Sequence, residues 1–409
     1  MRAAEAVGEF VSLALRLDAL LPGAADLPGA RPALGKATPA AVVAGAGRLA
    51  AALPDTGLGP ERERFLRAQL LAVEWTARRL AGQRVPFDLE VAASYEVRTS
   101  LGAEDIYRRI HRELAELLPG RGPLAGRMQA HRDHDEVPVA RLLPAVHAIS
   151  AALRERTRAV MSLPDDEHVE YRMVPNAPWS ALHQYLGGHR SLVTLNAGAR
   201  LRWAQLVHLV AHEAYPGHHT ERCRREAGRV AAGWEEHRVV LAVSPQGTLA
   251  EGAAELGLHA LVGPRWGRFA ETALDGVLPG FDGEHAERVQ AATAGLARVR
   301  QDASVMLHGQ AVRADEVLAH LRRWALFDDT RAARVLRFLR HPVWRAYPAA
   351  YVEGGELLRR WWDLDPRPAR FVRLLDEPLT PAAVRAELAS GGSAGPALRE
   401  GPFTGTAPR

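Results

Sequence analysis

Cysteine is almost absent from this 409-residue chain. Cys223 is the only one, so no disulfide can form within the chain, and a reducing, cytoplasmic setting is expected. No apolar run approaches the roughly 20 residues that a membrane-spanning helix needs, so we expect no membrane partner. Residues 1–23 carry too little positive charge for a signal peptide and have the pattern of an amphipathic helix. The absence of these features favours an ordinary globular protein.

Lysine is equally scarce, because Lys36 is the only lysine among 52 basic residues. The arginines that make up the rest are interspersed with Asp and Glu along the whole chain, and the net charge is only +4. A nucleic-acid-binding surface needs basic residues concentrated in a stripe, with aromatic residues for stacking. No such stripe is visible, so we expect no nucleic-acid partner.

The hydrophobic pattern is mostly helical. Apolar residues recur at spacings of three and four, which predicts helices over 61–82, 104–118, 138–162, 201–215, 285–307, 314–326 and 330–340. Two short segments, 168–174 and 191–196, instead look like strands. They flank the Gly187–Gly188 turn, so we expect a small antiparallel β ribbon. The predicted fold class is mainly α, with this ribbon near the functional site.

The chain offers no clear linker between domains. We expect an N-terminal helical region over 1–165 and a second helical region, with the ribbon, over 166–390. Because no Pro/Gly/Ser-rich break separates them, the two regions should form one interlocked unit. Residues 391–409 have little apolar content and are expected to form a flexible tail.

The chemically informative segment is 201–221, LRWAQLVHLVAHEAYPGHHTE. Its apolar helical pattern delivers His212 and Glu213 to a defined point. Pro216 and Gly217 then interrupt the helix, and His218 and His219 follow at once. Two imidazoles with an adjacent glutamate are typical of zinc hydrolases, in which the glutamate serves as general base toward the attacking water.

Three histidines compete to be the partner of His212. His218 lies six residues on, about 120° off the face of an unbroken helix, so it requires the Pro–Gly break to redirect the chain. His219 returns to that face but lies about 10 Å further along the axis. His208 has the chelating spacing of four residues, although it leaves Glu213 at the wrong end of the pair. We favour His218 and assign His219 to an outer or substrate-contacting role.

A third ligand is expected from the segment after 245. Glu251 and Glu255 lie one helical turn apart there. Glu251 would complete a set of two histidines and one glutamate, which leaves one coordination position open. Glu255 could orient a ligating histidine through its other ring nitrogen. The expected cofactor is therefore Zn²⁺, about one per chain.

HEAYPGHH at 212–219, followed by Glu-Gly at 251–252, resembles the bacterial family called domain of unknown function 885. Members of that family resemble helical gluzincin metallopeptidases, so the resemblance implies a gluzincin-like fold. It also implies that His212, His218 and Glu251 bind the metal and that Glu213 is the base.

The resemblance extends more weakly toward the C-terminus. Arg300 and His308 match an Arg and a His eight apart in the family, and Tyr351–Gly354 matches its Tyr-x-x-Gly. The chain departs from the family where a Trp, an Asp, a Gln and a Pro-Gly-Gln are usual, and has instead Ala253, Ser304, Glu221 and Arg345-Ala346-Tyr347. These departures lie in the expected substrate-facing lining.

Other side chains could contact the substrate. A polarised carbonyl needs a donor opposite the metal, and we assign that role to Tyr351 and His308. An extended substrate could add as a strand to the ribbon, with Arg190 holding its terminal carboxylate in a bidentate pair.

The sequence thus predicts a zinc-dependent hydrolase that cleaves an amide bond in a peptide or peptide-like small molecule. The alternative is a metal-stabilised binding or accessory protein, serving for example a biosynthetic pathway, without hydrolytic turnover. A ferrous oxygenase would use a similar ligand set but needs no glutamate beside the first histidine.

Overall fold

The computed structural model describes residues 1–29, 35–177 and 179–391. The chain is mainly helical, as predicted, with 66% of its residues in helices. The tail predicted at 391–409 lies, apart from Gly391, outside the described residues. No helix in the described ranges is long and apolar enough to cross a bilayer.

The first half of the chain contributes α1 (Ala3–Leu20), α2 (Pro39–Ala52), α3 (Pro60–Leu80), α4 (Phe87–Tyr95), α5 (Glu104–Leu117), α6 (Leu124–His134) and α7 (Val139–Val160). The second half contributes α8 (Trp203–Glu213), α9 (His218–Arg225), α10 (Pro245–Val262), α11 (Trp266–Leu274), α12 (Gly283–Thr293), α13 (Ala297–Ser304), α14 (Ala314–Trp324), α15 (Asp329–Arg340), α16 (Gly355–Asp363), α17 (Pro368–Asp376) and α18 (Pro381–Ala389). The strands are β1 (Ala25–Asp26), β2 (His168–Val174), β3 (Ala181–Gly187), β4 (Arg190–Asn196) and β5 (Val240–Leu241).

The helices predicted from apolar spacing are confirmed, with one interruption. The segment predicted as a single helix over 285–307 divides into α12 and α13, joined by a short 3₁₀ turn. Gly295 lies in that turn, where an added Cβ would be 2.7 Å from Ile110 of α5. The close approach of α5 therefore coincides with the place where the long helix breaks.

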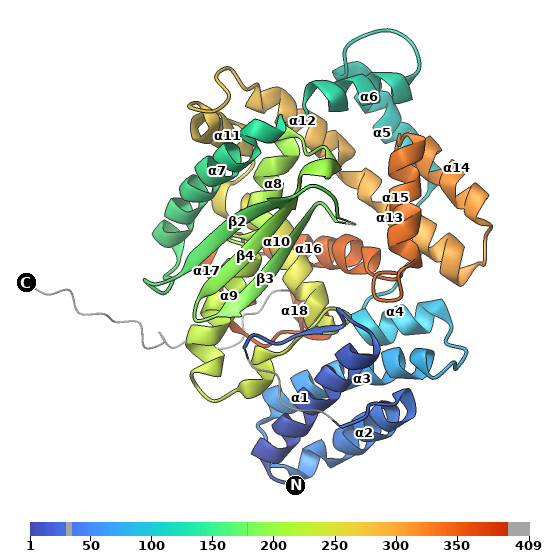
Figure 1. Cartoon of the computed structure of the whole chain (residues 1–409), viewed down its shortest axis with the longest axis vertical. Coiled ribbons are helices and arrows are strands. Elements are labelled where there is room, and N and C mark those ends of the chain that lie inside the picture. Colours follow the sequence, from blue (N-terminus) through green and yellow to red (C-terminus); the bar gives the residue numbers. More distant parts are fainter. Residues whose placement is uncertain (30–34, 178, 392–409) are drawn as a thin grey trace, which may run out of the picture.

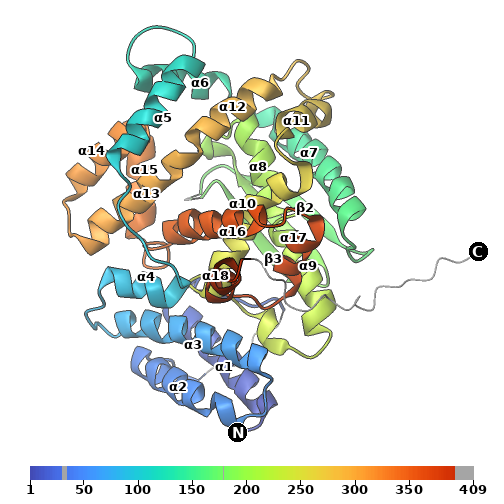
Figure 2. The same ribbon diagram turned by 180° about the vertical axis from the view of Figure 1, so that it is seen from behind.

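Helix α10 is the centre of the fold. It packs against α3, α4, α8, α16 and α17, and it lies at the middle of the molecule when viewed from behind (Figure 2). Ser244 is the N-cap of this helix, and its hydroxyl accepts a hydrogen bond from the amide of Gly247. Most of the side chains of α10 are buried. Gly252 lets the neighbouring backbone approach, because an added Cβ would be 3.0 Å from the carbonyl oxygen of Gly354. A helix buried along most of its surface can hold a site in the protein interior.

The β structure differs from the predicted antiparallel ribbon. Strands β2 and β4 pair in parallel, with His168 opposite Arg190, and β3 pairs antiparallel with the other edge of β4. The Gly187–Gly188 turn joins β3 to β4, so the antiparallel partner across that turn is β3. The prediction was wrong because it overlooked β3, in which partly buried side chains alternate with exposed ones. Figure 1 shows the three-stranded sheet in front of α8, α9 and α10.

The hydrophobic cores draw on both halves of the chain. Phe10 and Phe65 share one core with Leu241 and Val343. A second core joins α7 and the sheet to α8 and α10, and a third joins α5 to α13 and α14. Position 165 therefore does not separate two cores.

The buried carboxylate of Glu167 links the sheet to α9 through hydrogen bonds. Glu167, just before β2, accepts hydrogen bonds from Tyr215 and from Arg154 Nε, the latter at 2.6 Å. His219 Nε2 lies 3.0 Å from the same carboxylate, and His219 Nδ1 lies 2.8 Å from the hydroxyl of Ser191 on β4. Burial alone would raise the pKa of Glu167, but the donors outweigh it and lower this pKa to about 2.

We expect Glu167→Gln to lower the free energy of unfolding at pH 7 by about 3 kcal/mol. The folded pKa lies below the ordinary value of 4.5, so the carboxylate stabilises the fold above pH 4.5 and loses this effect as the pH falls toward 2. The difference in the free energy of unfolding between the variant and the wild type should therefore become smaller as the pH is lowered. Urea unfolding at pH 7 and pH 3 measures it, with the exposed Glu235→Gln as control. A difference that stays the same at both values would contradict this account.

Candidate metal centre

The chain reverses direction between α8 and α9. Helix α8 ends at Glu213, and the amide of Gly217 donates to the carbonyl of Ala211 at 2.9 Å, which folds the turn back over the end of α8. Pro216 packs against α10, since a Cβ added at Gly257 would be 2.9 Å from its ring. Helix α9 then begins at His218. The Pro–Gly break thus redirects the chain so that His218 lies beside the end of α8.

Three side chains meet where α8, α9 and α10 converge. His212, His218 and Glu251 each offer a ligand atom, and these atoms all lie within 4.8 Å of one another. His212 Nε2 is 3.3 Å from Glu251 Oε2, and His218 Nε2 is 3.4 Å from Glu251 Oε1. The rings of the two histidines are nearly perpendicular, with centroids 4.7 Å apart. The structure therefore brings together the three residues that the sequence proposed as ligands.

Neighbouring oxygens orient two of these side chains. Glu255 Oε1 lies 3.2 Å from His212 Nδ1, so the Nδ1–H can donate to the half-exposed carboxylate while Nε2 faces Glu251. The hydroxyl of Tyr347 donates to Glu251 Oε1 at 2.7 Å. Glu255 thus occupies the orienting position expected from its spacing.

Glu213 is buried next to these ligands, with 8% of its surface exposed. Burial raises its pKa, while positive charge on His212 and His218 would lower it. A carboxylate whose pKa is raised from its ordinary value of 4.5 binds a proton more readily near neutrality. This is the electrostatic environment that a general base requires.

The other two histidines considered as partners of His212 lie elsewhere. His208 packs edge-on against Trp266, with centroids 4.6 Å apart, and burial lowers its pKa to about 4. His219 is completely buried and engaged with Glu167 and Ser191. Its ring is therefore enclosed between Glu167 and Ser191, with no exposed surface for the substrate contact that was one of its two predicted roles.

Of the two predicted oxyanion donors, Tyr351 lies at the site and His308 lies away from it. Tyr351 stacks on His212, with ring centroids 5.9 Å apart and planes at 15°. His308 instead has its Nε2 2.8 Å from the carbonyl oxygen of Leu339, and its ring packs near Phe87. The hydrogen bond of His308 fits a structural role and not the predicted oxyanion donor. Arg190 is exposed at the start of β4, on the rim of a separate cavity.

Two residues at the site were missed from the sequence. Tyr347 lies one helical turn before Tyr351 in the chain, and that spacing could have assigned it to the same face. His183, on β3, has its ring centroid 5.8 Å from that of His218, and burial lowers its pKa well below the ordinary value. Recognition of β3 would have revealed it, because His183 lies on the inward-facing side of that strand.

The fold and the site together describe a mainly helical protein with a His–His–Glu cluster beside a buried glutamate. No protein-family model and no curated protein sequence matches the chain. Among solved structures, it is similar to a protein from Shewanella oneidensis described as a putative lipoprotein of unknown function. The two share a TM-score of 0.54 and 13% sequence identity over 87% of this chain and 74% of that one. At this identity, the similarity concerns the fold alone.

We expect Gly217→Ala to destabilise the protein by about 3 kcal/mol. An added Cβ would be 1.9 Å from the carbonyl oxygen of His212 and 2.5 Å from that of Ala211, and neither backbone atom can move without disturbing the end of α8. Denaturant unfolding measures the loss. Gly47→Ala is the control. Gly47 lies within α2, and an added Cβ would have no atom within 4 Å, so this variant should raise the free energy of unfolding by up to about 1 kcal/mol. Equal stability of both variants would show that the turn is not closely packed.

Proposed function

We propose that this protein is a zinc-dependent hydrolase that cleaves an amide bond in a peptide or peptide-like small molecule. The observation that carries the proposal is the convergence of His212, His218 and Glu251, with Glu213 buried beside them. Two imidazoles and one carboxylate from separate helices are the ligand set of catalytic zinc sites that keep an open position.

The donor set fits zinc in its spacing. Zinc–nitrogen and zinc–oxygen bonds of about 2.0–2.1 Å place tetrahedral ligand atoms roughly 3.3–3.4 Å apart. The separations between the histidine nitrogens and the Glu251 oxygens are 3.3 and 3.4 Å. Glu251 Oε2 is also shielded from solvent and has no hydrogen-bond partner among the residues that the structure describes, and a bound cation would satisfy it.

In the proposed hydrolysis, each residue of the site has a separate role. When bound, Zn²⁺ supplies Lewis-acid polarisation of a carbonyl and lowers the pKa of water. Glu213 accepts the proton of the attacking water and returns it to the leaving nitrogen. Glu255 holds His212 in the orientation that directs its Nε2 toward Glu251. Tyr351, against the face of His212, is placed to donate to the oxyanion that develops at the carbonyl.

Membership of the domain of unknown function 885 family, with a gluzincin-like fold, is part of this proposal. Its support is the motif HEAYPGHH and the downstream Glu251, whose side chains meet in space. The same ligand set would serve the alternative, a metal-stabilised accessory protein, so the two functions differ in turnover and not in metal content.

Wild-type protein should contain about one zinc per chain, and His212→Ala should contain almost none. His208→Ala is the matched control, since His208 lies one turn earlier on α8 and packs against Trp266. It should retain the zinc of the wild type. Elemental analysis of the folded, dialysed proteins measures the content. Zinc loss in His208→Ala with retention in His212→Ala would reverse the ligand assignment, and a wild type that takes up no zinc would refute the proposal.

Glu213→Gln should keep its zinc and lose hydrolysis by at least a hundredfold, because the amide cannot accept the proton of the attacking water. A screen of peptides and N-acyl amino acids, with a chelator as control, identifies the substrate on which the comparison is made. Glu235→Gln, an exposed glutamate after α9, should retain wild-type turnover. A zinc-loaded wild type that cleaves nothing in the screen would favour the accessory protein, and an active Glu213→Gln would exclude Glu213 as the base.

A further inference from the structure

A cavity of about 250 Å³ lies where the β3–β4 turn approaches α9 and the segment around β1. Its wall includes Gly187 and Gly188 of the turn, and a Cβ added at Gly187 would be 3.5 Å from Pro28. The metal ligands do not line it. The cavity is therefore a feature separate from the candidate metal centre, at the end of the sheet where the Gly187–Gly188 turn joins β3 to β4.

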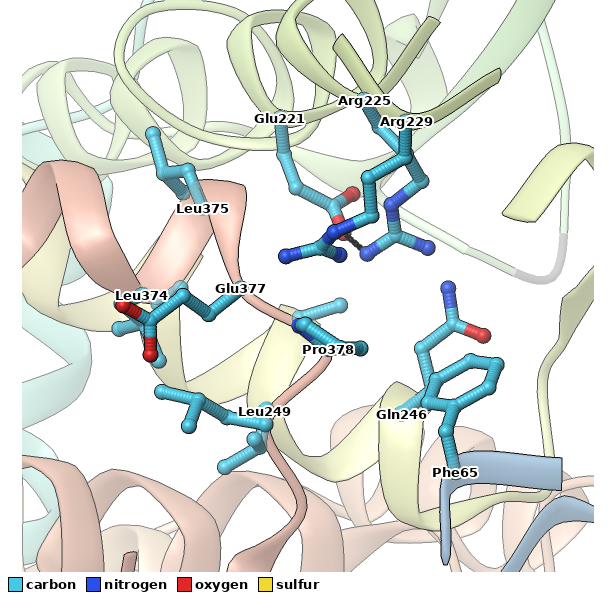
Figure 3. Close-up of a pocket in the computed structure, with 13 residues that line it drawn as sticks. Phe65, Glu221, Arg225, Arg229, Gln246, Leu249, Leu374, Leu375, Glu377 and Pro378 are labelled. Atoms are coloured by element: carbon cyan, nitrogen blue, oxygen red, sulfur yellow. Dashed lines mark hydrogen bonds and ion pairs between the residues drawn. The ribbon is translucent and has the colours of Figure 1, made fainter. Parts of the chain in front are cut away.

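Positive charge dominates this cavity. Its lining includes four arginines and two acidic residues: Arg190, Arg222, Arg225, Arg238, Asp26 and Glu226. Glu226 already accepts hydrogen bonds from the hydroxyl of Tyr185 and from the amide of Gly188. Arg225 is paired with Glu221, as Figure 3 shows in the adjoining pocket. Among the described residues, Arg190 and Arg222 are the lining guanidinium groups with the fewest hydrogen bonds and ion pairs.

Besides Arg225 Nε, polar atoms of two other buried side chains in the lining have no hydrogen-bond partner within the described residues. Arg222 Nε is shielded from solvent, and its nearest carboxylate oxygen, on Glu221, is 3.6 Å away. His237 is 2% exposed, and neither of its ring nitrogens is bonded. Burial and nearby arginines hold the pKa of His237 well below its ordinary value, so the neutral ring retains one N–H to donate. Unpaired buried donors are costly unless a ligand satisfies them.

Helix α9 connects this cavity to the candidate metal centre. Arg222 lies four residues after His218, on the same helix face. The same helix packs against β3, where His183 lies close to His218 and Gly187 lines the cavity. Strand β3 is an edge strand of its sheet. A ligand extended along this edge could therefore reach from the metal ligands to the cavity.

We propose that this cavity binds a carboxylate group of the substrate through Arg222, Arg190 and His237. This proposal rests on the proposed hydrolase function. It adds that the substrate of the hydrolase is an acidic peptide or N-acyl amino acid. Two guanidinium groups and a neutral N–H together offer the fork and the single donor that a carboxylate accepts.

A pair of probes tests the charge requirement directly. N-acetylglycine carries a carboxylate, and N-acetylglycinamide has nearly the same shape without the charge. Ligand-observed NMR titration of the full chain should give at least about tenfold tighter binding of the carboxylate. The titration is repeated after chelation of the metal, because a carboxylate can also bind zinc. Binding by the cavity survives chelation, whereas its complete loss would overturn the proposal.

Substitutions locate the binding. Arg222→Gln and Arg190→Gln should each weaken binding of N-acetylglycine about tenfold or more. Arg190 is exposed, so its variant remains informative about binding even if Arg222→Gln fails to fold. Arg172→Gln is the control, since Arg172 is an exposed arginine on β2, at the other edge of the sheet, and should bind as wild type.

Wild-type affinity in both cavity variants, or equal affinity for the two probes, would refute the carboxylate site. Because the decisive titrations use metal-free protein and measure no turnover, that result would leave the proposed hydrolysis standing. Conversely, an active Glu213→Gln variant would leave the carboxylate site intact.

Discussion

The geometry of the candidate metal centre depends on one backbone contact, the closure of Gly217 onto the end of α8. Its amide bonds to Ala211, and its α-carbon lies so close to the His212 carbonyl that no larger residue fits. This closure starts α9 beside the residue where α8 ends. His218 then joins His212, while His219 points the other way and binds Glu167 and Ser191 at the sheet. One helix thus faces the candidate metal ligands and the sheet at the same time.

The second constraint is the concentration of charge in the protein interior. Glu213 and Glu251 are buried at the junction of α8 and α10, with Glu255 at its margin and the imidazoles of His212 and His218 beside them. Burying carboxylates costs free energy unless they are paired. A divalent cation held by these groups would supply the missing positive charge, and this links the electrostatics of the site to its proposed chemistry. Strongly shifted pKa values at such a cluster are typical of functional sites.

Local hydrophobic periodicity was sufficient to predict most of the helices, because their apolar faces are long and regular. It failed for the sheet. In strand β3 the leucines at 182 and 186 are exposed while His183 lies on the buried side, so the apolar pattern does not mark the buried face of this strand. Without β3, the parallel pairing of β2 with β4 could not be foreseen, nor could the approach of His183 to His218.

The sequence alone determined which groups are available for chemistry: a helix ending in His212 and Glu213, a break at Pro216–Gly217, and Glu251 one turn before Glu255. These follow from residue type and spacing, which are local properties. Only the tertiary structure decided between His208, His218 and His219, since the choice depends on how far the chain turns after α8. It likewise added Tyr347 and joined Arg190 with Arg222 and His237 at one cavity. Those residues are far apart in the chain, and no periodicity relates them, because their proximity results from packing between distant elements.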